Sequence, residues 1–322
     1  MDSSAEKRVL VTGGAGFVGS HLVDALVAGG RKVMVLDNFD TFYDPTIKRD
    51  NLRSALACEA VELVEGDVRD SVLVGDVFSG FNPDLVYHLA ARVGVRASVE
   101  DPLGYEEVNV RGSINVFRAA AEVGVKAVVV ASSSSVYGNT RAPFREDDPA
   151  DAPLNPYAAS KRAVELFAHG FSYLTGMPII AARLFTVYGP RQRPDLAIHK
   201  FTRLIVSGQP IPRFGDGSSC RDYTYVDDIV EGLCRAASLR DGFRIINLGG
   251  GQKVSLNRLV TVLEEHLGVS ARIEECPPKA EDMQLTWADI SKAKELLDWC
   301  PSVKLDRGIE AFVDWFRSRN RQ

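Results

Sequence analysis

The chain contains little cysteine, and its few cysteines are widely spaced. Only 5 cysteines occur among 322 residues, at positions 58, 220, 234, 276 and 300, and no two of them form a Cys-x-x-Cys pair. The 5 histidines are equally dispersed. This spacing excludes the dense disulfide framework of small secreted domains and gives no sign of a structural metal site. We therefore expect reduced thiols and no metal.

Long hydrophobic runs and an excess of basic residues are also missing. No stretch approaches the roughly 20 apolar residues of a membrane-spanning helix. The first residues lack the cationic-then-apolar order of a signal peptide. The formal net charge is -5, which argues against nucleic acid or an anionic membrane surface as the principal partner. We expect a cytoplasmic protein that binds neither nucleic acid nor membrane.

What the chain does have is an alternation of short apolar runs with longer helical patterns. The runs are rich in β-branched residues and occur at 8–12, 32–36, 61–64, 85–88, 127–130 and 178–181. Runs that are apolar on both faces and separated by crossover-length segments predict a parallel sheet covered by helices. The sequence thus predicts an α/β fold with a Rossmann-type, doubly wound parallel sheet.

The composition changes after Arg183. Loops rich in Pro and Gly are followed by helical patterns near 226–238, 255–267 and 289–298. We expect residues 1–182 to form the Rossmann domain, with returning segments near 224–250. Residues 183–322 should mainly form a smaller α/β substrate-binding domain. No low-complexity linker separates the two, so they should pack closely with a cleft between them.

A glycine-rich turn follows the first predicted strand, in Thr12-Gly-Gly-Ala-Gly-Phe-Val-Gly-Ser-His21. Its glycines fit both G-x-x-G-x-x-G and G-x-G-x-x-G, which let the backbone approach a pyrophosphate at a helix N-terminus. A chance glycine-rich turn is the alternative, but the strand before it and the amphipathic helix after it favour dinucleotide binding. The second strand ends in Asp37, whose carboxylate would bind ribose hydroxyls and repel a 2′-phosphate. No Arg or Lys occupies positions 38–40, so we predict NAD in preference to NADP.

Further motifs follow in order along the chain: Gly66-Asp67-Val68, His88-Leu-Ala-Ala91, Asn109, the serines 132–135 and Tyr157-Ala-Ala-Ser-Lys161. Together with the glycine turn, this series resembles the extended short-chain dehydrogenase/reductase family, the branch that contains nucleotide-sugar epimerases and dehydratases. The resemblance runs essentially end to end. Its specificity comes from several separate motifs in the same order.

The resemblance implies a set of cofactor contacts. The residues that it assigns to NAD are Gly13, Gly16, Phe17, Val18, Gly19, Asp37, Asn38, Asp67, Val68, Leu89, Ala90, Ala91, Tyr157 and Lys161. It also implies that Asn109 supports the active site, although a helix residue with a purely structural hydrogen bond is an open alternative. We interpret His88 as a structural histidine at a strand end.

Tyr157 and Lys161 are four residues apart, so they would lie on one face of a helix. Beside a nicotinamide cation, the positive charges would lower the pKa of the Tyr157 phenol toward the range of a general base. The resemblance assigns that role to Tyr157, with Lys161 also bonding the nicotinamide ribose. It places Ser133 as the partner of the substrate hydroxyl. An ordinary helix surface is the alternative for a Tyr/Lys pair alone.

The serines bear on which reaction is catalysed. Family members that remove water resemble one another in carrying an Asp-Glu pair where this chain has Ser134-Ser135, and neither hydroxyl can replace a carboxyl group in that elimination. UDP-glucuronate decarboxylases look similar but carry Glu at the position of Ser135. Epimerisation remains: Tyr157 takes the proton from the C4 hydroxyl, hydride passes to NAD, the 4-keto sugar rotates, and hydride returns to its other face.

Two segments resemble UDP-glucuronate 4-epimerases more closely than the UDP-glucose enzymes, residues 37–49 and 183–195; in the latter an Asn commonly stands at the position of Thr186. Oxidation of glucuronate at C4 creates a β-keto acid that readily loses carbon dioxide. Hydroxyls of Ser134, Ser135 and Thr186 could bind the carboxylate and fix its torsion. The resemblance therefore implies conversion of UDP-glucuronate to UDP-galacturonate.

Several alternatives stay open at this point. The runner-up activity is UDP-glucose 4-epimerase, followed by UDP-glucuronate decarboxylase. The serines could merely satisfy backbone groups where a strand ends. A protein of another class, a non-catalytic NAD-responsive regulator on the same fold, would typically lack the tyrosine or the lysine that this chain retains.

The second domain should bind the nucleotide end of the substrate. Arg221 matches the family's diphosphate-binding arginine, and Arg193 is a candidate near the sugar or nucleotide. The family usually shows Arg-x-Gly-Asp late in the chain, whereas Lys279-Ala-Glu-Asp282 stands here. Asp282 is retained, but a lysine does not reproduce a bidentate guanidinium contact, so the uridine-ribose contacts are in doubt. The resemblance also implies a homodimer joined through the helices near 101–123 and 157–174.

Overall fold

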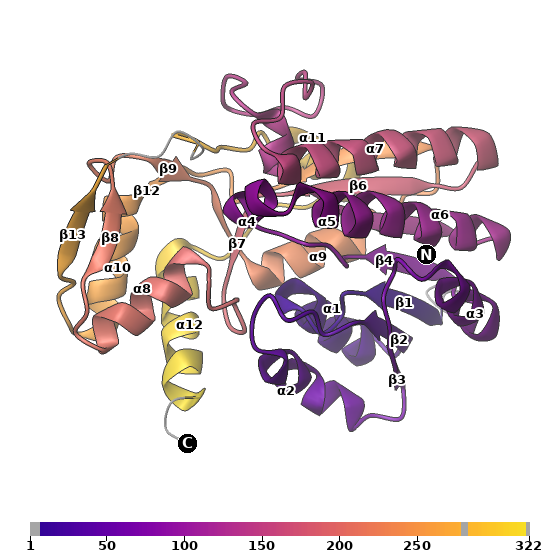
Figure 1. Ribbon diagram of the computed structural model, residues 1–322, viewed down its shortest axis with the longest axis horizontal. Helices are drawn as coiled ribbons and strands as arrows, with labels where there is room; N and C mark the ends of the chain where they lie inside the picture. The colour runs from indigo at the N-terminus through magenta and orange to yellow at the C-terminus, as the bar shows by residue number, and fades with distance from the viewer. Residues whose placement is uncertain (1–6, 278–282, 320–322) are drawn as a thin grey trace.

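The computed structural model describes residues 7–277 and 283–319. At its centre is a parallel sheet of 7 strands in the order β11-β6-β5-β4-β1-β2-β3 (Figure 1). The strands are β1 (Arg8–Thr12), β2 (Lys32–Asp37), β3 (Val61–Glu65), β4 (Leu85–His88), β5 (Ala127–Ser133), β6 (Ile179–Leu184) and β11 (Phe243–Leu248). The order reverses between β1 and β4, so the predicted doubly wound α/β fold is confirmed.

The strands form where the chain is apolar on both faces. In β1, Val9 and Val11 join one hydrophobic core while Leu10 joins the core on the opposite face. Every residue of β5 is buried. Because helices cover both faces, neither face of these strands carries a polar stripe. The predicted strands begin at the observed first residue or one residue before it, but β5 continues into Ser132 and Ser133.

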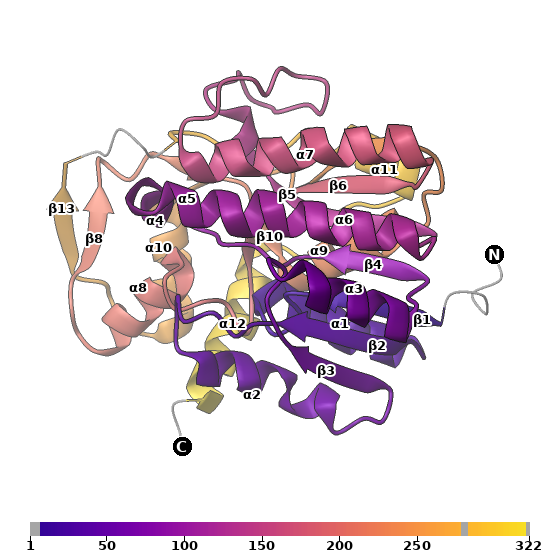
Figure 2. The same ribbon diagram turned by 45° about the vertical axis from the view of Figure 1, so that its right-hand side comes forward.

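Helices from distant parts of the chain cover the two faces. One face is covered by α1 (Phe17–Ala28), α2 (Pro45–Leu56) and α9 (Val226–Ala236). The other face is covered by α3 (Ser71–Phe81), α6 (Gly112–Glu122) and α7 (Pro156–Thr175), of which α6 and α7 run side by side (Figure 2). Strand β11 pairs with β6, and α9 packs against α1, so part of the second half of the chain completes the central sheet.

A run of short helical turns connects β4 to α6. It consists of α4 (Val95–Glu100), α5 (Pro102–Tyr105) and the π-helical turn η2 (Glu106–Arg111). A second irregular element, the 3₁₀ turn η3 (Ser134–Tyr137), follows β5 directly. Single π-helical turns are rare and often occur at functional sites. Both turns lie at the carboxyl edge of the sheet.

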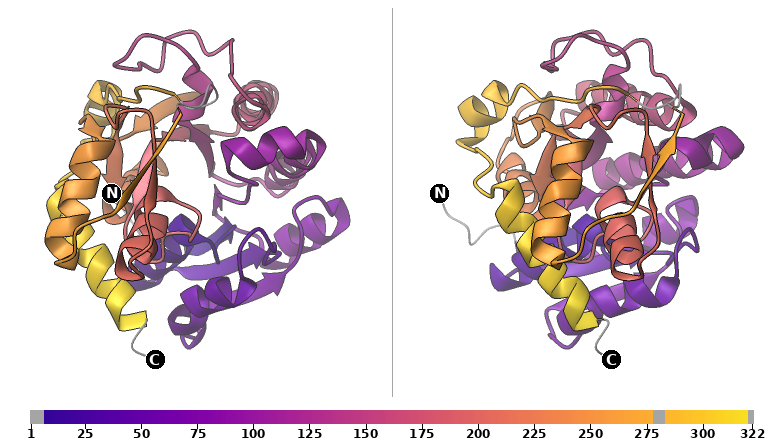
Figure 3. Two further views of the ribbon diagram at one scale, coloured as in Figure 1. Left: turned by 60° about the vertical axis from the view of Figure 1, so that its left-hand side comes forward. Right: turned by 90° about the vertical axis from the view of Figure 1, so that its left-hand side faces the viewer.

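The remaining elements form a small lobe beside this edge (Figure 1). It contains three two-stranded pairs, β7 (Thr186–Tyr188) with β10 (Tyr223–Tyr225), β9 (Cys220–Arg221) with β12 (Val254–Ser255), and β8 (Ile211–Phe214) with β13 (Ile273–Cys276). Its helices are α8 (Ala197–Val206), α10 (Leu256–Leu267) and α12 (Leu305–Arg319). The helix α11 (Ser291–Leu297) instead packs against β11 and α9 of the central domain. The yellow α12 lies alongside the orange α10 (Figure 3). In the part of the chain that the structure describes, no helix combines the length and apolarity needed to cross a membrane.

Candidate active site

Most of the predicted site residues come together at the carboxyl edge of the central sheet. Gly13 follows β1, Asp37 ends β2, Asp67 comes after β3, Leu89 follows β4 and Ser133 ends β5. Because neighbouring parallel strands end at the same edge, these residues converge although they are far apart in sequence. In doubly wound sheets, ligands bind at this edge where the strand order reverses.

The glycine turn leaves no room for side chains. A Cβ atom on Gly19 would lie 2.1 Å from the Gly13 carbonyl oxygen, and one on Gly13 would lie 2.6 Å from the Ala90 nitrogen. Gly13 also has a φ of 72°, which favours glycine. The N-cap of α1 is Gly16, so no side chain bonds the N–H groups of the first turn, which begins with Phe17 and Val18. Such a bare helix N-terminus against a tight turn suits the pyrophosphate of a dinucleotide.

Asp37 stabilises the glycine turn through hydrogen bonds to backbone N–H groups. Its carboxylate accepts hydrogen bonds from the N–H of Ala15 at 2.9 Å and of Phe39 at 2.8 Å. Burial raises the pKa of Asp37, while these two bonds and the charge of Lys48 oppose the rise. Each carboxylate oxygen keeps a further lone pair, so Asp37 can still accept from ribose hydroxyls.

Asn38 and Asp67 are brought together from β2 and β3. The Asn38 amide donates to the Asp67 carboxylate at 2.9 Å, and Arg69 donates to the same carboxylate through its backbone and its guanidinium. Burial would raise the pKa of Asp67, but the bonds from Arg69 and Asn38 outweigh it and lower that pKa. Val68, between them, is 4% exposed. Asn38 and Asp67 thus lie together at the carboxyl edge of the sheet.

Tyr157 and Ser133 form the centre of the site. Tyr157 lies in the first turn of α7, which Asn155 caps by accepting from the Ala158 N–H. Burial raises the pKa of Tyr157, and the hydrogen bond from Ser133 and the charge of Arg193 lower it. Ser133 therefore lies next to the Tyr157 phenol, and its predicted role as partner of the substrate hydroxyl stays a prediction.

Lys161 lies one turn further along α7 and is 5% exposed. Its ammonium group donates to the Ala131 carbonyl at 2.8 Å. Burial lowers the pKa of Lys161 to about 8, although the nearby negative charge of Glu165 raises it. A lysine with this pKa changes its charge within the working range of most enzymes.

Sequence reasoning missed the partner of Ser132. The Ser132 hydroxyl donates to Glu165 at 2.6 Å, and Arg183 binds the same carboxylate through two bonds of 2.8 Å. Glu165 and Arg183 are each 1% exposed. A sequence signal was available for this contact, because Glu165 and Arg183 are charged residues at otherwise apolar positions of a helix and a strand. The Ser132 hydroxyl thus donates to a buried carboxylate within the protein.

Ser134, Ser135 and Thr186 differ from Ser132. Among the residues that the structure describes, their hydroxyls have no hydrogen-bond partner, although Ser133 accepts from the Ser135 N–H at 3.1 Å. Ser133 pairs with Leu184 in the register of β5 and β6, so η3 and β7 leave the sheet from adjacent positions. The three hydroxyls therefore lie on neighbouring elements, of which η3 contacts α7.

Arg193 lies in the loop between β7 and α8. Its guanidinium bonds both carboxylate oxygens of Asp195, at 3.0 and 2.8 Å, and lies 5.6 Å from the ring centre of Phe42. The charge of Arg193 lowers the pKa of Tyr157. Its side chain is 14% exposed.

Arg221 lies in β9 at the junction of the lobes, and its guanidinium donates to the Cys220 carbonyl at 3.0 Å. It is partly buried. Asp282 and Lys279 lie outside the described residues, so their predicted relation to the uridine ribose stays a prediction.

Asn109 shapes the site without facing it. Its side chain accepts from the Arg92 N–H at 2.8 Å and donates to the Arg92 carbonyl at 3.0 Å and to the Ser160 hydroxyl at 2.9 Å. These bonds tie the loop after β4 to η2 and to α7, beside Tyr157. This arrangement matches the alternative given above for Asn109, a residue whose hydrogen bonds are structural.

His88 is a structural histidine, as predicted. Its ring nitrogens bond Thr12 at 2.7 Å and Ser113 at 2.9 Å. Because the Ser113 hydroxyl donates to the Asn109 carbonyl, it must accept from His88 Nε2. Burial lowers the pKa of His88 to about 3, so the ring stays neutral.

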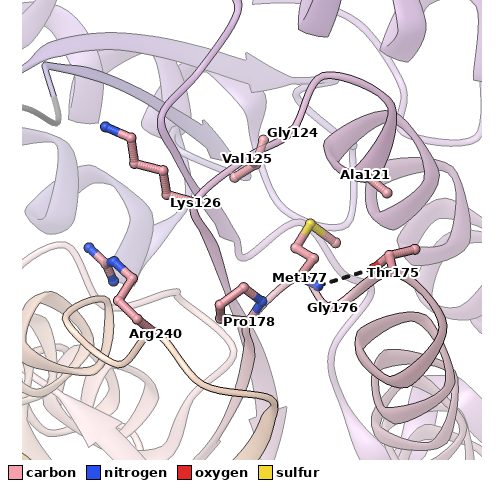
Figure 4. Close-up of a pocket in the computed structure, with 9 residues that line it drawn as sticks. All are labelled: Ala121, Gly124, Val125, Lys126, Thr175, Gly176, Met177, Pro178 and Arg240. Carbon is pink, nitrogen blue, oxygen red and sulfur yellow. Dashed lines mark hydrogen bonds between the residues drawn. The ribbon is translucent and has the colours of Figure 1, made fainter.

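Two further observations delimit the site. Within residues 7–277 and 283–319, no group of three or more His, Cys, Asp or Glu side chains is placed to hold a metal ion. A surface hollow of about 460 Å³ is lined by Lys126, Met177, Pro178 and Arg240 (Figure 4). It lies before β5 and β6, at the amino edge of the sheet, so it is separate from the site.

Comparisons with known proteins agree with this geometry. The protein family described as GDP-mannose 4,6 dehydratase matches residues 10–312. A UDP-glucuronate 4-epimerase of Thermodesulfobacterium geofontis is 41% identical over 308 residues, which cover 95% of this chain and 95% of that protein. UDP-glucuronate 4-epimerase 3 of Arabidopsis thaliana is 40% identical, over 96% of this chain and 76% of its own length.

Solved structures of nucleotide-sugar 4-epimerases are also similar to this chain. The crystal structure of UDP-glucuronic acid 4-epimerase from Bacillus cereus with UDP-glucuronic acid and NAD has a TM-score of 0.92 and 34% identity, covering 97% of this chain and 99% of that one. UDP-glucose 4-epimerase from Thermotoga maritima with UDP-glucose has a TM-score of 0.88 and 32% identity, with coverage of 97% and 99%. The chain therefore belongs to the GDP-mannose 4,6 dehydratase family, and its resemblance to the nucleotide-sugar epimerases and dehydratases is confirmed.

Proposed function

We propose that the protein is an NAD-dependent nucleotide-sugar 4-epimerase that interconverts UDP-glucuronate and UDP-galacturonate. One observation carries the proposal: among the described residues the hydroxyls of Ser134 and Ser135 have no hydrogen-bond partner, and they directly follow Ser133, whose hydrogen bond lowers the pKa of Tyr157. The relatives named UDP-glucuronate 4-epimerase support the same activity.

The residues at the carboxyl edge fit NAD. The glycine turn and the first turn of α1 would hold its pyrophosphate, and Asp37 and Asn38 its adenosine ribose. Asp67 and Val68 would meet the adenine, Leu89, Ala90 and Ala91 would line the path between the two nucleotides, and Lys161 would bond the nicotinamide ribose. Bound NAD supplies a group that accepts a hydride from C4 and gives it back.

Tyr157 and Ser133 would handle the proton of the C4 hydroxyl. Tyr157 is the general base, and the Ser133 hydroxyl bonds the same substrate oxygen and orients it toward the phenol. The positive charge of Lys161, one turn away on α7, favours the ionised phenol. Because the site is buried, this charge acts more strongly than it would in water.

Ser134, Ser135 and Thr186 would bind the carboxylate of the sugar. Hydrogen bonds from hydroxyls to a carboxylate stabilise its charge and restrict its rotation. Both effects oppose loss of carbon dioxide from the 4-keto intermediate, since that step needs the carboxylate to lose its stabilisation and align with the carbonyl group. Neither serine can serve as the carboxyl acid or base of a dehydration.

The two parts of the chain would divide the substrate between them. Residues 1–182, with the returning α9 and β11, hold the cofactor and the catalytic residues. Residues 183–322 mainly hold the UDP moiety, with Arg221 on the diphosphate and Arg193 near the sugar. Asp282 would meet the uridine ribose.

We also propose a cytoplasmic homodimer joined through α7 and the helices of residues 101–123. One face of α7 exposes large apolar side chains: Leu166 is 58% exposed, Phe167 44%, Tyr173 82% and Leu174 83%. Leu103 of α5 is 75% exposed. A contiguous apolar face of this kind is typical of a protein-protein contact.

The test is incubation of the purified protein with UDP-glucuronate, followed by proton NMR, with UDP-glucose in a parallel tube. We expect conversion of the uronate to its C4 epimer without accumulation of NADH or UDP-pentose. UDP-pentose as the main product would contradict the carboxylate contacts. Conversion of UDP-glucose alone would make the protein a UDP-glucose 4-epimerase, and no conversion of either would favour a regulator.

A further inference from the structure

Asp222 is a buried carboxylate that the proposed mechanism does not use. It lies between β9 and β10 and is 0% exposed. Its oxygens accept hydrogen bonds from the backbone N–H groups of Gly250 at 2.5 Å, Gly251 at 3.1 Å and Ala288 at 2.9 Å. Asp222 thus gathers two segments that are distant in sequence, the loop after β11 and the segment before α11.

The backbone of Asp222 connects β7 to the segment before α11. Its carbonyl accepts from the Thr186 N–H at 3.0 Å, and its own N–H donates to the Thr286 hydroxyl at 3.2 Å. Arg221 immediately precedes it in the chain. Figure 1 shows β7 between the small lobe and the central sheet.

The glycine loop is packed tightly against this carboxylate. A Cβ atom on Gly250 would lie 2.4 Å from the Tyr223 carbonyl oxygen and 2.9 Å from the Asp222 carboxylate. Because backbone atoms stand at that distance, even an alanine at position 250 must push the loop away. The N–H groups of Gly250 and Gly251 donate to the carboxylate at this close approach.

We propose that Asp222 is a positioning residue that holds Thr186 and Arg221 at a fixed spacing, so that one UDP-sugar can engage both at once. The inference rests on the proposed function, in which Thr186 meets the sugar and Arg221 the diphosphate. Asp222 acts through these two residues, and its loss weakens substrate binding more than it slows the chemical steps.

Asp222 holds Thr186 and Arg221 in place in its ionised form. Titratable neighbours on the surrounding elements are Arg221 and Tyr223 in the flanking strands, Lys253 beyond the glycine loop and Asp289 after Ala288. Among the described residues none of them forms an ion pair with Asp222. Burial raises the pKa of Asp222 to about 6, and the three N–H groups oppose the rise. Below that pH the acid is protonated and accepts these bonds more weakly, so the KM for the UDP-sugar should increase.

The experiment compares the NAD-loaded wild type with the variants Asp222→Asn, Gly250→Ala and Asp228→Asn. Asp228 is a matched control, because it is also buried and accepts from the backbone N–H groups of Ser302 and Val303, but it lies in α9. We expect Asp222→Asn and Gly250→Ala to raise the KM for UDP-glucuronate about tenfold with kcat unchanged, since bonds to a buried charge are lost. Asp228→Asn should leave KM unchanged.

The pH dependence of KM gives a second readout that does not depend on any variant. For the wild type, KM should increase as the pH falls through about 6, and Asp222→Asn should abolish that increase. If both Asp222→Asn and Gly250→Ala fail to fold, the wild-type profile decides: a KM that does not change across this range overturns the inference.

The outcomes separate this inference from the proposed function. Equal KM values for Asp222→Asn and Asp228→Asn in an active enzyme overturn the inference and leave the epimerase standing. If the wild type converts no UDP-sugar, the proposed function fails. Calorimetric binding of UDP-glucuronate then decides: weaker binding by Asp222→Asn than by Asp228→Asn supports the inference, and equal or absent binding overturns it.

Discussion

Ser135 and Ser132 are three residues apart, yet their hydroxyls have opposite surroundings. Ser132 donates to the buried Glu165, whereas Ser135 has no hydroxyl partner among the described residues. We predict that Ser135→Ala and Thr186→Ala raise the fraction of UDP-pentose formed from UDP-glucuronate, because the carboxylate loses hydrogen bonds. Proton NMR of the products measures this fraction.

Ser132→Ala is the matched control for those variants. It should lower the free energy of unfolding by about 1–3 kcal/mol, because the Glu165 carboxylate loses a donor. It should not change the ratio of products. Product ratios that are identical in all of these variants would show that Ser135 and Thr186 do not restrain the carboxylate.

The pKa of Lys161 predicts how activity responds to alkaline pH. Burial lowers this pKa to about 8, well below the ordinary range of a lysine, so the folded protein loses the Lys161 charge as the pH rises through about 8. Without that charge the Tyr157 phenol is harder to ionise. We therefore expect kcat to fall above pH 8, and this limb to move to higher pH in Lys161→Arg, whose guanidinium stays charged. A kcat that is constant to pH 9.5 in the wild type would rule this out.

At the scale of elements, the strands and the glycine turn could be predicted because local rules determine them. Apolar runs on both faces predict buried parallel strands, and Gly13 and Gly19 are needed where the backbone leaves no room for a side chain. Asp37 was predictable for the same reason, since it ends a strand at the expected distance from the turn.

The rest of the site depends on contacts between distant segments, which local patterns do not contain. Asn109 bonds Arg92 and Ser160 because a π-helical turn rotates it inward, and no residue type predicts such a turn. Glu165 and Arg183 pair across 18 residues, and Asp222 bonds residues on two loops. Each polar group was visible in the sequence, but its partner was not.

The ion pair of Glu165 with Arg183 joins α7 to β6. We predict that Glu165→Ala lowers the free energy of unfolding by about 3–5 kcal/mol, because it leaves the Arg183 charge buried without a partner. Urea unfolding followed by circular dichroism measures this loss. The exposed pair of Lys32 with Glu62 is the control, and Glu62→Ala should cost at most about 1 kcal/mol. Similar losses for the two variants would contradict the role given to burial.

At the scale of the whole molecule, contacts of α1 connect the two lobes. His21 of α1 donates to the Pro190 carbonyl at 2.9 Å, and Asp24 of the same helix pairs with Arg191 at 2.7 Å. Arg193 follows two residues later. The helix whose N-terminus would hold the pyrophosphate therefore also anchors the loop that carries a candidate substrate arginine.

The apolar face of α7 predicts how two molecules associate. Leu166 and Leu174 are 58% and 83% exposed and lie on one face of the helix, so a double change of both to Glu would place charges at the centre of the proposed interface. We expect the wild type to sediment as a dimer and the double variant as a monomer. Val206→Glu is the control, because Val206 is 57% exposed but lies on α8 in the small lobe. It should remain a dimer, and a double variant that also stays dimeric would place the interface on another surface.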